Sequence, residues 1–378
     1  MKYVYLDNAA TTKTLPECVD VCDKYMAETY FNPSALYQNA IDVARDMKKA
    51  RQTIANVLGV EEGTITFVSS GSESDNQALF GAHKKHGSRI IVSAIEHSAV
   101  YNAANELKQR GYDVVDAPVD ENGKVIEREF VKLLNDNVSL VSIMHVNNVT
   151  GAINDIQRLV ELTKSISPRA LFHSDGVQAF CKIPVKLKRL NVDFYSASSH
   201  KIGAPKGSGF LYVKKGVTVS PLIYGGGQEK GLRSSTENVP AIMAFATAAE
   251  IAYKNISNLQ ENGKRFFDYV RNKLSELPDV KILSPVDGAP HIFSVSFKLV
   301  RGEVLMHTLE GYGYITGIGS ACSSKKGTPR IPAALGLKDG YQEGILRLSI
   351  NAYDDYDAED FIEKLLESYN LLKKYIRV

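Results

Sequence analysis

The sequence has no excess of either charge and only four cysteines among its 378 residues. Forty-five basic residues stand against 43 acidic ones, so the overall charge does not favour nucleic acid or an anionic membrane as a partner. A small-molecule substrate is therefore the default expectation. The cysteines are too few and too scattered for a disulfide framework, which favours a reducing compartment.

Long apolar runs are also missing. No stretch approaches the roughly 18 apolar residues that a membrane span needs. The start, MKYVYLDNAATT, lacks the basic, apolar and small-residue zones of a secretory signal. We therefore expect a cytoplasmic protein that is neither secreted nor held in a membrane.

What the sequence does contain is an alternation of short β-rich runs and helical patterns. The β-rich runs are 64–70, 89–97, 138–148, 170–178, 192–199 and 209–213, with helical spacing between the first five. Near-continuous apolar strands separated by helices predict an α/β protein, whose mostly parallel sheet is covered by helices on both faces. The remaining helices and a strand-like run predict a smaller α+β domain. We expect a large domain at 15–255 and a small one formed by 1–14 and 256–378.

Each of these predicted strands ends in polar residues. Ligands of open α/β sheets bind outside the carboxyl ends of the strands, so these ends are expected to converge on one cleft. The residues concerned are Ser69–Ser74, His97, Asn147, Asn148, Asp175–Gln178 and Ser198–Lys201.

Two strand ends have chemistry suited to charged ligand groups. The run SSGSESDNQAL is a Ser/Gly turn that opens a helix, where backbone N–H groups, the helix dipole and the Ser72 hydroxyl can hold an anion. Asp175 ends an apolar strand, where a buried carboxylate is costly unless it meets a cation. Taken alone, the turn can be an ordinary serine cap, and Asp175 can be a helix cap or part of an internal salt bridge. His97 and His145 can each be core histidines, and the position of His145 inside a strand favours that role.

Lys201 connects these signals. A lysine beside a phosphate site, facing a carboxylate that needs a cation, meets the requirements of pyridoxal 5'-phosphate (PLP). The lysine amine can form a Schiff base with the aldehyde, Asp175 can keep the ring nitrogen protonated, and the Ser/Gly turn can take the phosphate. A surface lysine near a strand terminus would leave both other features unexplained.

The chain resembles the cysteine desulfurases of the class V aminotransferase superfamily along nearly its whole length. The motifs that carry the resemblance are, in order, YLDNAATT (5–12), NPS (32–34), SSGSESDN (69–76), EHSAV (96–100), SIMHVNNVTG (142–151), SDGVQ (174–178), SSHKIGAPKG (198–207), GGGQEKGLRSSTEN (225–238), GSACSS (319–324) and LRLS (346–349). The resemblance implies the PLP-transferase type I fold. It also implies a homodimer that removes sulfur from L-cysteine, leaving L-alanine and an enzyme-bound persulfide.

The resemblance also implies a role for each matching residue. Lys201 would be the Schiff-base lysine, Asp175 the partner of the ring nitrogen, and His97 the residue that stacks over the ring and moves protons. Arg347 would bind the substrate carboxylate, a task that suits a guanidinium fork. The other cofactor contacts would come from Ser70, Gly71, Ser72, Asn148, Gln178, Ser198, His200 and, from the other subunit, Thr236. Asn148 would contact the ring hydroxyl or the substrate near it.

Cys322 is the residue that would separate desulfuration from transamination. It lies in TGIGSACSSKKGTP, whose Gly and Ser content and lack of apolar periodicity indicate an exposed loop. The neighbouring Lys325 and Lys326 favour its thiolate modestly. The resemblance makes Cys322 the persulfide carrier. Inert, buried positions are expected for the remaining cysteines, and no metal site is expected; those cysteines are Cys18, Cys22 and Cys181.

The sulfur would then pass to an acceptor protein, either an iron–sulfur scaffold or a tRNA-thiolation sulfurtransferase. The sequence departs from the family pattern at Tyr37, where histidine is common, at Ser72, where threonine is frequent, and in SINAYDDYD after Arg347. Serine keeps the hydroxyl needed for phosphate. A class V transaminase or a selenocysteine lyase would use the same cofactor site, whereas a non-enzymatic sulfur or metal carrier would hold no cofactor.

Overall fold

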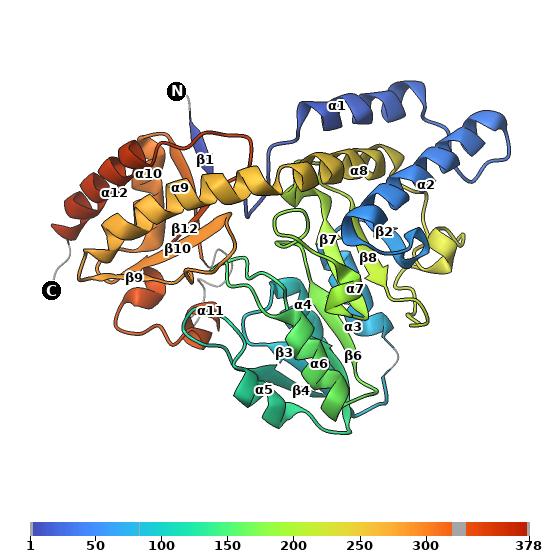
Figure 1. The fold of residues 1–378 in the computed structure, drawn as a ribbon, viewed down its shortest axis with the longest axis horizontal. Helices are drawn as coiled ribbons and strands as arrows, with labels where there is room; N and C mark the ends of the chain where they lie inside the picture. Colours follow the sequence, from blue (N-terminus) through green and yellow to red (C-terminus); the bar gives the residue numbers. More distant parts are fainter. Residues whose placement is uncertain (1–2, 83, 320–329, 376–378) are drawn as a thin grey trace.

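The computed structural model describes residues 3–82, 84–319 and 330–375, and two β-sheets organise them (Figure 1). The larger sheet has the strand order β2-β8-β7-β6-β5-β3-β4. Its strands are β2 (Ile65–Val68), β3 (Arg89–Ser93), β4 (Asp113–Ala117), β5 (Val138–Ser142), β6 (Leu171–Asp175), β7 (Phe194–Ser198) and β8 (Gly209–Val213).

This sheet is mostly parallel, as predicted. Strands β4, β3, β5, β6 and β7 pair in parallel, and only β8 runs against its neighbours β7 and β2. Strand β4 was not among the predicted runs. It forms the edge of the sheet and its exposed Asp113 and Asp116 interrupt the apolar pattern, which is a common way to protect an edge strand.

Helices cover both faces of the larger sheet. Ile90 and Val92 pack in one apolar cluster, which α3 and α4 cover, whereas Ile91 packs in the other, which α2, α6 and α8 cover. Such alternation along one strand means that both faces are buried. The helices of this part are α1 (Pro16–Asp23), α2 (Gln38–Leu58), α3 (Gly71–Gly81), α4 (Ser98–Gln109), α5 (Glu127–Leu133), α6 (Ile156–Ile166), α7 (Leu187–Leu190) and α8 (Val239–Lys254).

The smaller sheet joins the two ends of the chain. Its strand order is β1-β11-β12-β10-β9, and β1 lies parallel to β11. Its strands are β1 (Val4–Leu6), β9 (Val280–Ile282), β10 (Ile292–Phe297), β11 (Tyr314–Ile318) and β12 (Ile345–Ser349), and its helices are α9 (Ile256–Ser275), α10 (Gly302–Gly311), α11 (Arg330–Ala334) and α12 (Ala358–Lys373). Helices α8 and α9 meet at Asn255 (Figure 1). A domain boundary at this point stays a prediction.

Short turns of other helix types complete the secondary structure. They are η1 (Lys24–Glu28), η2 (Glu62–Thr64), η3 (Ser199–Lys201), η4 (Glu229–Gly231) and η5 (Tyr341–Glu343). Across the residues that the structure describes, no helix combines the length and apolar character required to cross a membrane.

Gly176 allows the chain to turn directly after β6. A Cβ atom at this position would lie 2.0 Å from ring atoms of Tyr195 on the neighbouring strand, so any other residue would clash. The backbone therefore passes close over β7 immediately after Asp175. This close approach places the residues that follow β6 beside those that follow β7.

Candidate active site

One cavity of about 340 Å³ lies at the carboxyl ends of the large sheet, where polar strand ends were predicted to converge. The predicted residues that line it are Ser70, Gly71, Ser72, His97, Asn148, Asp175, Gln178, Ser198, His200, Lys201 and Arg347. These residues come from β6, β7, β12, the start of α3 and the segments after β3 and β5. The structure thus brings them together around one space.

Lys201 is the amine of this cavity. It ends the short turn η3, and its Nζ donates to the carbonyl oxygens of Ala9 at 2.7 Å and Ala10 at 2.6 Å. Burial, followed by repulsion from Arg347, lowers the pKa of Lys201 to about 8. An amine with such a pKa is partly neutral at physiological pH, and the neutral amine is the form that attacks a carbonyl group.

The start of α3 presents groups to the cavity that can hold an anion. Ser70 caps this helix, and its side chain accepts the Glu73 N–H at 3.1 Å. Gly71 and Ser72 follow at the first positions of the helix, where backbone N–H groups have no partner within it. Burial lowers the pKa of the nearby His200 to about 4, so its ring is neutral at physiological pH. This end offers N–H and O–H donors without an added charge.

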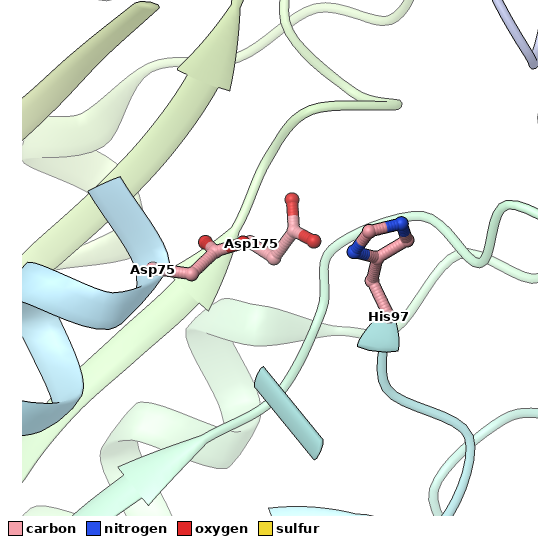
Figure 2. Close-up of side chains that lie close together, drawn as sticks. All are labelled: Asp75, His97 and Asp175. Atoms are coloured by element: carbon pink, nitrogen blue, oxygen red, sulfur yellow. The ribbon is translucent and has the colours of Figure 1, made fainter. Parts of the chain in front are cut away.

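Two buried carboxyl groups also line the cavity. Asp175 lies between Asp75 and the exposed His97 (Figure 2), and one potential ligand atom from each of the three residues lies within 4.8 Å of the others. Burial raises the pKa of Asp75 to about 7. Burial and then the charge of Asp75 raise that of Asp175 to about 6. The charged state of Asp175 therefore requires a cation in the cavity.

Asp75 is a site residue that the sequence interpretation missed. Its exposed fraction is 1%, and its Oδ1 has no hydrogen-bond partner within the described ranges. The His173 ring lies 3.5 Å away, but burial lowers the pKa of His173 to about 4, so it supplies no positive charge. Asp75 lies inside a helix among other polar residues, and no local sequence signal distinguishes it from them.

His97 begins α4 and reaches the cavity from there. Its Nδ1 accepts the Ala99 N–H at 3.2 Å, so the neutral ring carries its proton on Nε2. His145, by contrast, is a core histidine as predicted, although it follows β5 instead of lying inside a strand. It is buried, its Nδ1 contacts the Tyr195 hydroxyl at 2.9 Å, and burial lowers its pKa to about 4.

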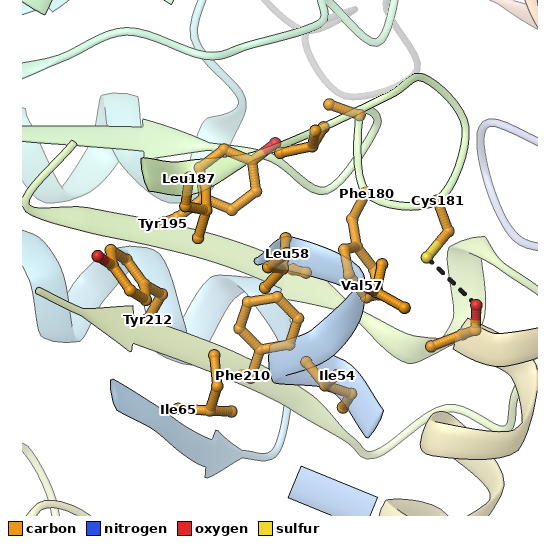
Figure 3. Close-up of a cluster of buried hydrophobic side chains, with 14 of the residues drawn as sticks. Ile54, Val57, Leu58, Ile65, Phe180, Cys181, Leu187, Tyr195, Phe210 and Tyr212 are labelled. Atoms are coloured by element: carbon orange, nitrogen blue, oxygen red, sulfur yellow. Dashed lines mark hydrogen bonds between the residues drawn. The ribbon is translucent and has the colours of Figure 1, made fainter. Parts of the chain in front are cut away.

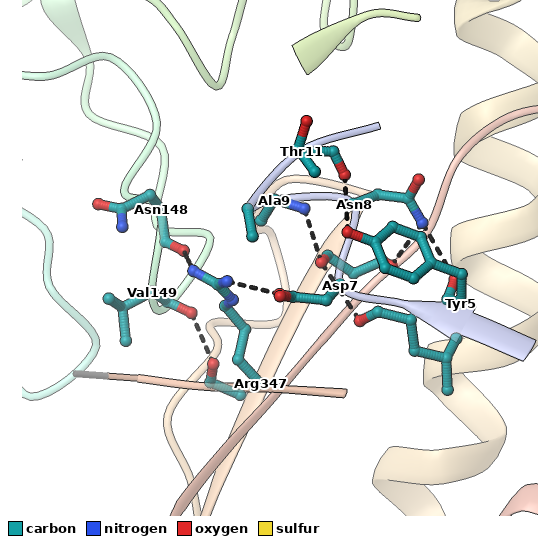
Figure 4. Close-up of polar contacts among 12 residues, drawn as sticks. Tyr5, Asp7, Asn8, Ala9, Thr11, Asn148, Val149 and Arg347 are labelled. Carbon is teal, nitrogen blue, oxygen red and sulfur yellow. Dashed lines mark hydrogen bonds and ion pairs between the residues drawn. The ribbon is translucent and has the colours of Figure 1, made fainter. Parts of the chain in front are cut away.

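Arg347 and the segment that follows β1 close the cavity. Arg347 donates from Nη2 to Asp7 Oδ1 at 2.6 Å and from Nη1 to the Asn148 carbonyl at 2.9 Å (Figure 4). Ala9 is held by its own N–H, which donates to Ser349 Oγ at 2.8 Å. The sequence interpretation also missed Asp7, which holds Arg347, and Ala9 and Ala10, which accept from Lys201. Ala9 and Ala10 act through backbone carbonyl groups, which every residue possesses.

The cavity passes a direct test for PLP. Three of its buried polar atoms lack a hydrogen-bond partner among the described residues: Asp75 Oδ1, Asn148 Oδ1 and Arg347 Nε. Unpaired buried polar atoms are rare and call for a ligand or water. A ligand that carries an anionic group and a protonatable ring nitrogen complements the start of α3 and the Asp175 carboxyl group. The residues present therefore fit this cofactor.

One predicted residue does not line the cavity, and another cannot be placed relative to it. Thr236 lies in a separate hollow, together with Ser69 and Glu237. Cys322 lies outside the described residues. On one side of its segment, a Cβ atom at Gly319 would lie 3.1 Å from Val149, and on the other side Arg330 donates to the carbonyl oxygens of Ala94 and Glu96, just before His97.

The other cysteines occupy protected positions. Cys18 and Cys181 are buried and Cys22 is partly buried. Cys181 donates to the Ala249 carbonyl at 3.5 Å (Figure 3), and Cys18 donates to that of Ala244 at 3.3 Å. Burial raises the pKa of all three thiols, that of Cys18 to about 12. These cysteines are therefore poor nucleophiles.

Comparison with known proteins defines the class first. The family model named Aminotransferase class-V matches residues 4–360, so the chain belongs to that family. It is 36% identical to "Cysteine desulfurase IscS" of Clostridium botulinum, with 97% of this chain and 94% of the relative covered. It is 35% identical to "Cysteine desulfurase IscS" of Methanosarcina thermophila, with 100% and 96% covered.

Solved structures agree with these sequence relatives. A "NifS-like protein" has a TM-score of 0.90 at 34% identity, with 98% of this chain and 100% of the other covered. "SspA in complex with cysteine" has a TM-score of 0.81 at 28% identity, with 93% and 99% covered. Within the class V family, the chain is a PLP-dependent cysteine desulfurase with the type I fold of such enzymes.

Proposed function

We propose that this chain removes sulfur from L-cysteine in the cavity described above and stores it on Cys322 as a persulfide. The observation that carries the proposal is the gathering of Lys201, the buried Asp175 and the open start of α3 around one space with unpaired polar atoms. Its amino-acid product is L-alanine.

Bound PLP supplies an aldehyde that joins to amines and a ring that accepts electrons. Lys201 would hold the aldehyde end and Asp175 the ring nitrogen. Ser70, Gly71 and Ser72 would hold the phosphate with Ser198 and His200, and Asn148 and Gln178 would contact the ring hydroxyl. Two charge contacts follow from the geometry: the start of α3 favours the phosphate, and the buried carboxylate of Asp175 favours a protonated nitrogen.

Lys201 and His97 would move protons. Lys201 has a pKa of about 8, so its free amine can accept a proton from a substrate carbon and return it at physiological pH. His97 holds its neutral-state proton on Nε2, because Nδ1 accepts the Ala99 N–H. It can therefore donate that proton from Nε2 into the cavity.

Arg347 would orient the substrate through its carboxylate. Asp7 and the Asn148 carbonyl hold its guanidinium in place, and its Nε is left without a partner among the described residues. The guanidinium is thus preorganised for an anion. The Asp7 carboxylate also partly neutralises the positive charge of the Arg347 guanidinium.

The Cys322 thiolate would attack the substrate sulfur. A new sulfur–sulfur bond forms, the substrate carbon–sulfur bond breaks with its electron pair going to carbon, and a proton then completes L-alanine. L-cysteine and one thiol thus become L-alanine and one persulfide, without another oxidant.

Mass spectrometry after incubation with L-cysteine tests this proposal. We expect the peptide that contains Cys322 to gain the mass of one sulfur atom, and L-alanine to appear in the solution. The C322A variant should lose both, with the yellow cofactor intact. Sulfur found only on Cys18, Cys22 or Cys181 would contradict the proposed role of Cys322.

The proposal extends to partners and location. The persulfide would pass to an iron–sulfur scaffold or to a tRNA-thiolation sulfurtransferase in the cytoplasm. The enzyme would be a homodimer, with Thr236 completing the phosphate site of the partner. The position of Thr236 outside the cavity of its own chain supports this, as do exposed apolar side chains before and within α2, including Leu36 at 93% exposure and Tyr37.

A further inference from the structure

The side-chain amide of Gln178 is held from two sides by protein groups. Its Nε2 donates to the Ala9 carbonyl at 2.9 Å, and its Oε1 accepts from Lys182 Nζ at 2.7 Å. A carbonyl can only accept, so the nitrogen must face Ala9. With the nitrogen facing Ala9, the oxygen faces Lys182 and accepts from its Nζ. Both contacts are satisfied by the same orientation of the amide.

Lys182 is buried without an acidic partner. Its exposed fraction is 6%, and it faces a smaller hollow of about 50 Å³ beside the cofactor cavity rather than the cavity itself. Burial, followed by the charges of Lys201 and Arg347, lowers the pKa of Lys182 well below its usual range. The titratable and charged groups that face it are Lys201, His200, Arg347, His291 and Cys181.

No ion pair within the described part of the chain therefore explains why a lysine stands at this position. An apolar side chain of the same length would avoid the cost of burying an amine. What the lysine adds is a hydrogen-bond donor aimed at the oxygen of Gln178.

We propose that Lys182 is a positioning residue that locks the Gln178 amide with its nitrogen toward the cofactor, so that Gln178 acts as a donor to the ring oxygen of PLP. This inference rests on the proposed function, in which Gln178 contacts that oxygen. Within the described residues the amide nitrogen has one acceptor, Ala9. Its second N–H is left for a ligand.

The orientation has a consequence for the charge state of the cofactor. A donor to the ring oxygen stabilises the ionised oxygen and lowers the pH at which it loses its proton. Without Lys182, the buried Gln178 oxygen would lose its partner, and the amide could turn that oxygen toward the cofactor instead. The ring oxygen would then keep its proton to higher pH.

The test is a pH titration of the visible absorption band of the purified holoenzyme without cysteine. We expect K182M, which keeps the length of the side chain and removes the donor, to raise the midpoint by about one pH unit. Q178L should raise it similarly. The double variant should shift no further than Q178L alone, because Lys182 acts through Gln178. K186M is the matched control, since Lys186 donates to Val57 and Tyr253 outside the cavity.

Q178E supplies a second test if K182M fails to fold. Its carboxylate keeps a partner for Lys182 but cannot donate, so its midpoint should also rise. An unchanged midpoint in K182M or Q178E, or a double variant whose shift is the sum of the single shifts, overturns the inference. Failure of the proposed function looks different: the wild-type protein would then form no coloured complex with PLP.

Discussion

Asp75 and Asp175 are buried side by side, and neither forms an ion pair with a lysine or arginine among the described residues. Their pKa values, about 7 and about 6, lie above those of aspartate in an unfolded chain. These two carboxyl groups therefore bind more protons in the folded protein without cofactor than in the unfolded chain between about pH 4 and pH 7. Their contribution to stability falls as the pH rises through that window.

Replacing Asp75 by asparagine should stabilise the cofactor-free protein at neutral pH. Asparagine resembles the protonated acid in shape and has no charge to bury. At pH 7.5 we expect the free energy of unfolding of D75N to exceed that of the wild type by about 2 kcal/mol. At pH 4.5 the gain should be much smaller. Urea unfolding at both pH values measures the difference.

Asp193 provides the control for this prediction. It is also buried, but it pairs with Lys164 at 2.6 Å and accepts the Phe172 N–H at 2.8 Å. Its replacement by asparagine breaks an ion pair, so D193N should be less stable than the wild type at pH 7.5. If D75N is destabilised to the same extent at both pH values, Asp75 contributes packing or hydrogen bonding rather than an unfavourable charge.

Individual residues differ in how far the sequence reveals them. Asp175 and Lys201 could be identified because each is a charged residue directly after an apolar strand, where burial demands a partner. Asp75 could not, because a helix with several polar residues does not show which of them faces a cavity. Ala9 contributes a backbone carbonyl oxygen, and the residue type does not show that such a group takes part in a site.

At the scale of elements, Arg330 fixes the start of α11 to the corner that carries His97. Its guanidinium donates to the carbonyl oxygens of Ala94 and Glu96 and lies 4.0 Å from the centre of the Tyr101 ring. A planar fork suits two carbonyl groups and an aromatic face together. This contact fixes the chain beside the residues that precede His97, eight residues after Cys322.

Removing this contact should slow sulfur transfer without disturbing the cofactor. For R330A we expect roughly tenfold slower persulfide formation, because small displacements of a reacting group are costly, and an unchanged absorption spectrum with PLP. Single-turnover assays with L-cysteine measure the rate. R301A removes an exposed ion pair with Glu343 in the small-sheet region and should behave as the wild type. An unchanged rate in R330A would show that this contact does not position the segment.

Elements were predictable where their burial was uniform. Strands β5, β6 and β7 are almost wholly buried, so their apolar runs stand out in the sequence. Edge strand β4 is half-exposed, and its two aspartates interrupt the apolar run by which a strand is predicted.

At the scale of the whole molecule, local sequence patterns do not show that β1 pairs with β11, more than 300 residues away. Val4, Tyr5 and Leu6 pair with residues 314–316, and Asp7 reaches Arg347. This pairing brings Ala9 and Ala10 to Lys201 and so ties the chain's first residues to the cavity. Only the assembled small sheet makes that connection.

Complementation between two inactive chains can decide whether the active site is shared between subunits. In a mixed dimer of T236A and K201A chains, a threonine that serves the partner leaves one site with both native residues. The other site then carries both defects. Mixing should therefore restore desulfuration at limiting PLP to about half the wild-type activity per mixed dimer. If Thr236 serves its own chain, no site regains both residues and the mixture stays as inactive as its parts. Light scattering on each sample checks that the mixed species is a dimer.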